Sequence, residues 1–416
     1  MWSIPSHLPH RLAICYFGHD WLSASLPGDH FADLERVVAE TKDRGYNCIR
    51  AEMGLDWMFD IEGRRRGPVE LTDWVPGASS NLHCMDGKGG ARYDVFDRVI
   101  RLFELAKQHD LYVITTTWTY SESTPWLAEQ SIRDEIFAIP VERRLLHMAE
   151  QYHRLLTALK GRGLHRHVAF VEVHNEIIHD NFPLGEANKR AAREAIAFLR
   201  ERHPDLLVTV DYSQLIPEMV PDNAQVVDHH VYVQGLMQAI LRKAGIGWGQ
   251  GVPDPEHNVL LRWLLKPDPM PWKEFLPRVE RVARYSLWGS NAALMWFYDN
   301  LDVERYDWWC LRHYGEYVPL MEFDLQQRFR AAGDFSAKVD LPAVVDEGYV
   351  LYPPRRSHFV QTAAGRWIAR TAVESAIAAN HWGILAEDYF RPNTLSWNDE
   401  REIAFIRELN QRIIES

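Results

Sequence analysis

Short apolar runs alternate with longer amphipathic stretches through the first half of this chain. The short runs have the length and the continuous hydrophobic character of strands in a parallel sheet, and the stretches between them have helical periodicity. Repeated strand–helix units of this kind predict an α/β fold, either a closed barrel or an open doubly wound sheet. We expect six strands in this half, at 11–18, 47–53, 111–117, 168–173, 206–211 and 225–232.

Two further strands, at 341–347 and 381–386, bring the expected number to eight. Eight strand–helix units favour a (β/α)8 TIM barrel over an open sheet, and a chain of 416 residues has a usual length for one such barrel with insertions. We therefore expect residues 1–416 to form a single barrel. Its covering helices are predicted at 30–44, 93–108, up to about 159, 187–201, 363–380 and 399–414.

Two segments interrupt the regular order. Residues 60–92 have little periodicity and are too long for a plain connection, which is typical of a functional or mobile loop. Residues 233–335 are rich in Trp and Pro and lie between the sixth and seventh strands. We interpret them as a mainly helical insertion that covers part of the site.

The composition is that of an ordinary water-soluble globular protein, with 46% hydrophobic and 25% charged residues. The formal charge of -12 argues against a nucleic-acid partner, and no apolar stretch reaches the ~20 residues that a membrane span needs. Four scattered cysteines and the absence of a visible leader favour a reducing, cytoplasmic location. A secretory leader already removed would leave the same sequence.

Two glutamates stand at the ends of two predicted strands. Asn175-Glu176 follows the fourth strand, and Glu347 ends the seventh. Active-site groups of (β/α)8 barrels lie at these carboxyl-terminal ends. Glycoside hydrolysis needs two such carboxyl groups, one to protonate the leaving oxygen and one to attack the anomeric carbon. The pair therefore predicts a glycoside hydrolase.

Polar residues in neighbouring strands fit this chemistry. Glu172, His174 and Glu176 alternate, so we expect them on one face of the fourth strand, and His230 and Tyr232 have the same spacing in the sixth. Arg50 interrupts the apolar second strand, and a buried arginine demands an anionic partner.

These neighbours assign a role to each carboxyl group. We expect Glu347 to be the nucleophile, held ionised by Arg50 and Tyr232. Glu176 would be the general acid and would retain its proton because Glu347 is negatively charged nearby. Asn175 would donate a hydrogen bond to the sugar 2-hydroxyl.

Aromatic residues extend the candidate site. Sixteen tryptophans mildly favour a carbohydrate ligand, because sugar rings stack on flat apolar faces. Trp118, just past the third strand, is either a sugar platform or an edge-packing residue. His19 and Asp20, after the first strand, are candidates for a substrate subsite.

The run Phe170-Val-Glu-Val-His-Asn-Glu176 resembles the strand-4 signature of the clan A glycoside hydrolases, in particular the cellulase-like family 5. The resemblance extends to Arg50, His230 and Tyr232, to Glu347, and to an aromatic residue near the eighth strand, here Trp382. It implies a retaining β-glycoside hydrolase with Glu176 as acid/base and Glu347 as nucleophile, and we expect no cofactor. A cytoplasmic location would favour an oligosaccharide or small glycoside as the substrate. Ile177 stands where proline usually follows the acid/base residue, which favours an altered substrate range.

Two other functions stay open at this stage. Glu176, Asp211, His230 and Glu347 end four predicted strands and could bind Mn²⁺ or Mg²⁺, as in a sugar isomerase or epimerase. A carbohydrate-binding barrel without catalysis is the other alternative. Exposed aromatic residues of the insertion could form the face of a homo-oligomer.

Overall fold

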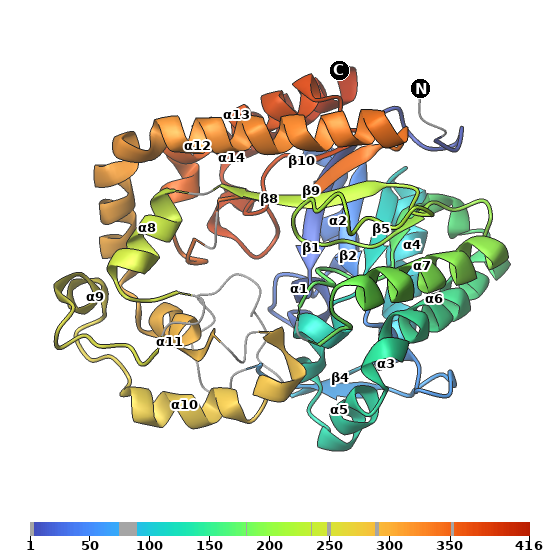
Figure 1. Cartoon of the computed structure of the whole chain (residues 1–416), viewed down its shortest axis with the longest axis horizontal. Coiled ribbons are helices and arrows are strands. Elements are labelled where there is room, and N and C mark those ends of the chain that lie inside the picture. The colour runs from blue at the N-terminus through green and yellow to red at the C-terminus, as the bar shows by residue number, and fades with distance from the viewer. Residues whose placement is uncertain are drawn as a thin grey trace.

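The computed structural model describes residues 4–74, 90–179, 181–233, 235–247, 251–287, 291–350 and 353–416. Within these residues, eight parallel strands form one sheet in the order β7-β6-β5-β2-β1-β10-β9-β8, with helices outside it (Figure 1). All eight predicted strands are present. They are β1 (Leu12–Gly18), β2 (Cys48–Glu52), β5 (Tyr112–Thr116), β6 (Val168–Glu172), β7 (Val208–Thr209), β8 (Val227–Val233), β9 (Ala343–Val350) and β10 (Gly383–Leu385).

Hydrogen bonds between residues in and beside β7 and β8 bring these two end strands of the sheet together. The Gln225 amide donates to the Val208 carbonyl at 3.1 Å, and the His230 amide donates to the Ser213 carbonyl at 2.7 Å. The Thr209 hydroxyl donates to the carbonyl of Val226 at 2.7 Å. The sheet therefore forms a nearly closed (β/α)8 barrel, as the sequence predicts.

The helices that cover the barrel each bury an apolar face, and side-chain caps fix several of their ends. Asp33 and Asp94 accept backbone amides of the first turns of α2 and α4, an arrangement that stabilises helix N-termini. Gly45, with φ of +86°, follows α2 and ends it, because glycine adopts this left-handed conformation without strain. The helices are α2 (Leu34–Asp43), α4 (Val95–Gln108), α6 (Arg144–Gly161), α7 (Glu186–Arg202), α13 (Ala363–Ala378) and α14 (Glu400–Glu415).

The insertion after β8 is mainly helical, as predicted. Figure 1 shows its first helices beside the barrel, whereas α12 runs along β8 and packs against α13. That the insertion covers the site stays a prediction, and its Trp248 and Trp288 lie outside the described residues. Its helices are α8 (Leu236–Lys243), α9 (Val259–Leu264), α10 (Trp272–Glu280), α11 (Ala292–Asn300) and α12 (Val303–Val339).

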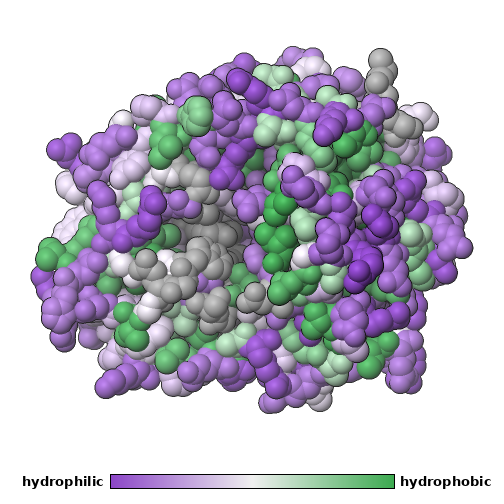
Figure 2. Space-filling view, in the orientation of Figure 1, coloured by the Kyte–Doolittle hydropathy of each residue, from purple (hydrophilic) through white to green (hydrophobic). Residues whose placement is uncertain are grey.

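The aperiodic segment 60–92 contains β3 (Val69–Leu71) and most of β4 (Ala91–Tyr93), which form a small antiparallel sheet. Residues 75–89 of this predicted loop lie outside the described part of the chain. Figure 2 shows a surface that is mostly hydrophilic, with a hollow beside a band of hydrophobic residues near the middle of this face. Within the described residues, no helix has both the length and the apolar character of a membrane span. The short helices are α1 (Asp20–Ser23), α3 (Leu55–Met58) and α5 (Gln130–Phe137).

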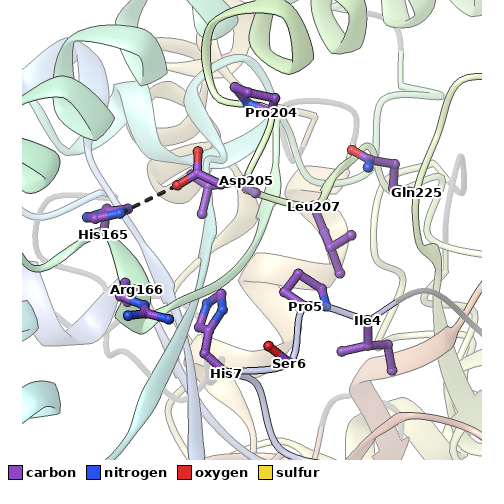
Figure 3. A pocket seen from close by; sticks show the side chains of 11 residues that line it. Ile4, Pro5, Ser6, His7, His165, Arg166, Pro204, Asp205, Leu207 and Gln225 are labelled. Carbon is purple, nitrogen blue, oxygen red and sulfur yellow. Dashed lines mark ion pairs between the residues drawn. The ribbon is translucent and has the colours of Figure 1, made fainter.

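The interior of the barrel near the start of the strands is filled by large apolar side chains. Trp382, which directly precedes β10, has none of its surface exposed, and its indole nitrogen donates to the Pro9 carbonyl at 3.1 Å. Its ring lies 6.2 Å from that of Phe170, measured between centroids. At the same end, a cavity of about 640 Å³ is lined by residues that include His7, His165 and Asp205 (Figure 3).

Trp382 therefore belongs to the packing core, and its removal tests this placement. We expect Trp382→Ala to lower the free energy of unfolding by about 3–5 kcal/mol, because a large cavity is left in the core. Trp308→Ala, at a position 58% exposed on α12, is the matched control and should change it by no more than about 0.5 kcal/mol. Urea denaturation measures both, and equal stability of the two variants would contradict the placement.

Candidate active site

A fully buried arginine, Arg50 of β2, lies at the centre of the polar residues of the barrel. Its Nη2 lies 2.9 Å from Oε2 of Glu172, and its Nε lies 2.6 Å from Oδ2 of Asp346. Its Nη1 donates to Oε1 of Glu347, and its Nη2 also donates to Oδ1 of Asn175 at 2.8 Å. The anionic partners that the sequence predicts for Arg50 are thus three carboxylates, which come from β6 and β9.

Glu347 is held at both carboxylate oxygens. Arg50 donates to Oε1, and the hydroxyl of Tyr232 donates to Oε2 at 2.6 Å. The three side chains come from β9, β2 and β8, and they fix the orientation of this carboxylate in the barrel. The structure thus brings Arg50 and Tyr232 to Glu347, in the arrangement expected from the sequence.

Glu176, on the segment that follows β6, faces Glu347. Its Oε1 lies 3.2 Å from Nδ1 of His230, and its Oε2 lies 3.1 Å from Nε2 of His179. One oxygen from each glutamate and one nitrogen of His230 all lie within 4.8 Å of one another. The backbone amide of Glu176 donates to Oδ2 of Asp211 at 3.1 Å, which anchors it to the segment that follows β7. The two glutamates therefore share one site.

The protonation expected for Glu176 is wrong in the free protein. Burial opposes ionisation of this carboxyl, but the hydrogen bonds from His179 and His230 outweigh burial, and the pKa of Glu176 lies well below its usual value. Burial likewise opposes the charged imidazoles, yet hydrogen bonding to Glu176 raises the pKa of His179, and Asp211 and Glu347 raise that of His230. The negative charge of Glu347 does not hold a proton on Glu176, because two imidazoles neutralise both acids.

The expected alternation of the strand also fails after Glu172. His174 packs outside the barrel, with its ring 4.4 Å from that of Phe182, and its Nε2 accepts the backbone amide of Tyr120. β6 ends at Glu172, and Glu176 has φ of +52°, a left-handed conformation that non-glycine residues rarely adopt. This turn, rather than strand alternation, directs Glu176 into the site.

A bulge in β9 explains why two consecutive acids, Asp346 and Glu347, both contact Arg50. In the pairing of β8 with β9, Val345 is opposite His229 and Gly348 is opposite Val231. Asp346 and Glu347 of β9 therefore lie opposite the single residue His230 of β8. Such a bulge changes the direction in which one of the two side chains points. Gly348 lies so close to β8 that a Cβ atom there would be 2.3 Å from the carbonyl oxygen of Val231.

His230 connects both glutamates to further buried acids. Its side chain is fully buried, its Nδ1 lies 3.5 Å from Glu347, and its Nε2 lies 3.4 Å from Asp211 and 3.5 Å from Asp346. Burial raises the pKa of Asp211 to about 6. Its neighbour His229 points the other way and packs beside His381, with 2.9 Å between the two Nε2 atoms.

Two groups of side chains among the described residues have the spacing of metal ligands. One group, Glu176, His230 and Glu347, contains three of the four ligands expected for an isomerase, and Asp211 is outside it. The other consists of Glu172, Asp228 and Asp346, deeper in the barrel. Burial raises the pKa of Asp228 well above its usual value, which favours a protonated carboxyl group at this position.

The remaining predicted site residues are buried. Trp118 is 1% exposed and lies beneath Arg50, whose guanidinium carbon is 4.7 Å from its ring, so in this structure it packs against the cation and offers no open face to a sugar. His19 lies beside Trp118 and within 3.0 Å of Glu122. Asp20 pairs with Arg391 at 3.7 Å and accepts from Asn393.

Trp382 is not part of the site. Because it directly precedes β10, it lies in the core at the end of the barrel opposite the carboxyl ends of the strands. An aromatic residue near the eighth strand is thus no evidence of a sugar contact here.

Sequence reasoning missed His179 and the acid Asp388. His179 follows Glu176 by three residues, and no periodic signal marks it. Asp388, past β10, is 1% exposed, and burial raises its pKa to about 7 while Arg391 opposes the shift. Its only sequence signal is its position just after a predicted strand end.

Solved structures that share this fold include a candidate glycoside hydrolase from Parabacteroides distasonis ATCC 8503, with a TM-score of 0.67 and 14% sequence identity, over 98% of this chain and 94% of that one. They also include the exo-β-1,4-mannosidase Op5Man5 from Opitutaceae bacterium strain TAV5, with a TM-score of 0.50 and 11% identity, over 100% of this chain and 62% of that one. No family profile and no curated protein sequence matches this chain significantly. At these identities the likeness establishes the barrel fold alone.

The network around Arg50 makes this residue a determinant of stability. We expect Arg50→Met to lower the free energy of unfolding by about 3–5 kcal/mol, because three carboxylates lose their buried cation. Arg64→Met is the control: Arg64 is 72% exposed and pairs with Asp60, so no measurable change is expected. Urea denaturation at pH 7 measures both free energies. An Arg50→Met protein with the stability of the wild type would show that the buried acids do not need this cation for folding.

Proposed function

We propose that this protein is a retaining β-glycoside hydrolase of clan A, related to the cellulase-like family 5, that acts on an oligosaccharide or small glycoside. The observation that carries the proposal is the opposition of Glu176 and Glu347 at the carboxyl-terminal ends of β6 and β9, with oxygens within 4.8 Å of each other. Retaining enzymes hold the two carboxyl groups about 5–5.5 Å apart, whereas inverting enzymes leave about 6.5–9.5 Å for a water molecule.

In the first step, an oxygen of Glu347 attacks the anomeric carbon and the glycosidic bond breaks. Arg50 and Tyr232 fix the orientation of the nucleophile, so little rearrangement is needed on attack. The leaving oxygen receives a proton from Glu176. Within the described residues Nδ2 of Asn175 makes no hydrogen bond, which supports its predicted donation to the 2-hydroxyl of the sugar.

In the second step, water releases the sugar from Glu347. Glu176 acts as the base and takes a proton from this water molecule, which attacks the anomeric carbon. The carbon–oxygen bond to Glu347 breaks, and its carboxylate returns to Arg50 and Tyr232. Two displacements at one carbon preserve the β configuration.

A metal-dependent isomerase is a second candidate, because Glu176, His230 and Glu347 have the spacing of metal ligands. Two contacts favour the hydrolase. Both oxygens of Glu347 already accept hydrogen bonds, and Asp211, the fourth expected ligand, accepts the backbone amides of Glu176 and Ser213. Arg50 has a clear role beside a nucleophile and none beside a divalent cation.

Nitrophenyl β-glycosides test the two roles, beginning with the β-mannoside because Op5Man5 is an exo-β-1,4-mannosidase. We expect Glu347→Gln to lose nearly all turnover on every substrate. Glu176→Gln should lose about 10²–10⁴-fold in kcat/KM on alkyl glycosides, which need a proton, but still form the glycosyl-enzyme from a dinitrophenyl glycoside. NMR should show the β anomer as the first product.

The controls separate the alternatives. Glu104→Gln changes a solvent-exposed acid on α4 and should leave turnover unaltered. EDTA should also have no effect, whereas its inhibition of the wild type would favour the metal-dependent candidate. An initial α product, equal losses in both glutamate variants, or sugar binding by calorimetry without cleavage would each contradict the proposal.

A further inference from the structure

His179 contacts the acid/base residue directly. It lies three residues beyond Glu176 in the segment after β6, and its Nε2 is 3.1 Å from Oε2 of Glu176. The His179 side chain is 27% exposed and that of Glu176 is 12% exposed. The pair therefore lies at the accessible side of the site, where protons can exchange with solvent.

The two imidazoles on Glu176 have different surroundings. The side chain of His230 is fully buried, and carboxylates of Glu176, Asp211, Asp346 and Glu347 face its two ring nitrogens. Four carboxylates therefore stabilise a proton on His230. Loss of this proton would leave their buried negative charges without a nearby positive charge.

The proton on His179 is held less tightly than the proton on His230. Glu176 is its only carboxylate partner within ion-pair distance among the described residues, while Glu122 and Asp211 act on it over a longer range. Neighbouring His174 adds no positive charge, because burial lowers the pKa of that imidazole to about 3. His179 can therefore carry a proton and also release it.

We propose that His179 stores the proton that Glu176 delivers to the leaving group, so that the two side chains work as one acid/base unit. This inference rests on the proposed hydrolase function. It follows from the hydrogen bond between the residues and from the exposure of His179, and His179 acts as a positioning residue that reaches the substrate only through Glu176.

The proton that His179 gives up in the first step is returned to it in the second. As the glycosidic bond breaks and Glu347 bonds to the anomeric carbon, the His179 Nε2–H bond breaks, an O–H bond forms on Glu176, and a proton passes from Glu176 to the leaving oxygen. His179 is then neutral. In the second step Glu176 takes a proton from water, passes it to Nε2 of His179, and restores the starting state while the bond to Glu347 breaks.

The pH dependence of kcat/KM for His179→Gln tests the inference. In the wild type the basic limb should report loss of the stored proton from an imidazole whose pKa the Glu176 carboxylate raises. In the variant the proton must reside on Glu176 alone, and a carboxyl releases it at lower pH, so this limb should move down by at least about one pH unit. Turnover of an alkyl glycoside should fall about 10²-fold, and glycosyl-enzyme formation from a dinitrophenyl glycoside should be nearly unchanged.

His165→Gln is the matched control. His165 is also partly exposed, at 22%, and pairs with Asp205 at 3.4 Å (Figure 3). It stands just before β6, so it lies at the other end of the barrel. Its pH profile and turnover should equal those of the wild type. A His179→Gln enzyme with an unshifted basic limb overturns the inference even where KM rises, since a purely structural role changes binding without moving that limb. The failure of Glu176 and Glu347 variants to lose activity would instead refute the hydrolase function.

Discussion

One buried cation organises the interior of this barrel. Arg50 is fully buried and contacts carboxylates of Glu172, Asp346 and Glu347, which come from strands on two sides of it. Burial of this many charges is strongly unfavourable unless each has a partner in good geometry. The positions of β2, β6 and β9 relative to one another are therefore constrained by the same contacts that orient Glu347 and Asn175. Stability and site geometry depend here on a single guanidinium.

Much of the fold could be predicted from the sequence, because the apolar runs of a parallel barrel are continuous and strong. All eight strands are found within a few residues of their expected places. The convergence of Arg50, Glu176, His230, Tyr232 and Glu347 also follows from strand order alone, since parallel strands present their carboxyl ends to one mouth. Residue type and position at a strand end are thus sufficient to predict that these side chains lie in one site, but not how each of them is oriented.

What the sequence does not reveal depends on irregular backbone and on charge. The left-handed turn at Glu176 and the bulge before Gly348 break the two-residue period, so alternation misplaces His174 and does not predict that Asp346 and Glu347 both face inward. His179 belongs to no periodic element, and its effect on Glu176 needs three-dimensional distances. Trp382 is misassigned because the resemblance requires only an aromatic residue near the eighth strand, whereas the predicted strand 381–386 already places Trp382 at its start.

The tight fit at Gly348 restricts how this protein can diverge. Any amino acid with a side chain would collide there with the backbone of β8 and separate the strand that bears Glu347 from the strand that bears Tyr232. A side chain at position 348 is therefore strongly disfavoured, because the backbone of β8 leaves no room for a Cβ atom. New substrate specificities in relatives of this chain should therefore arise from changes in the segments around the site, while the contact between β8 and β9 at Gly348 stays the same.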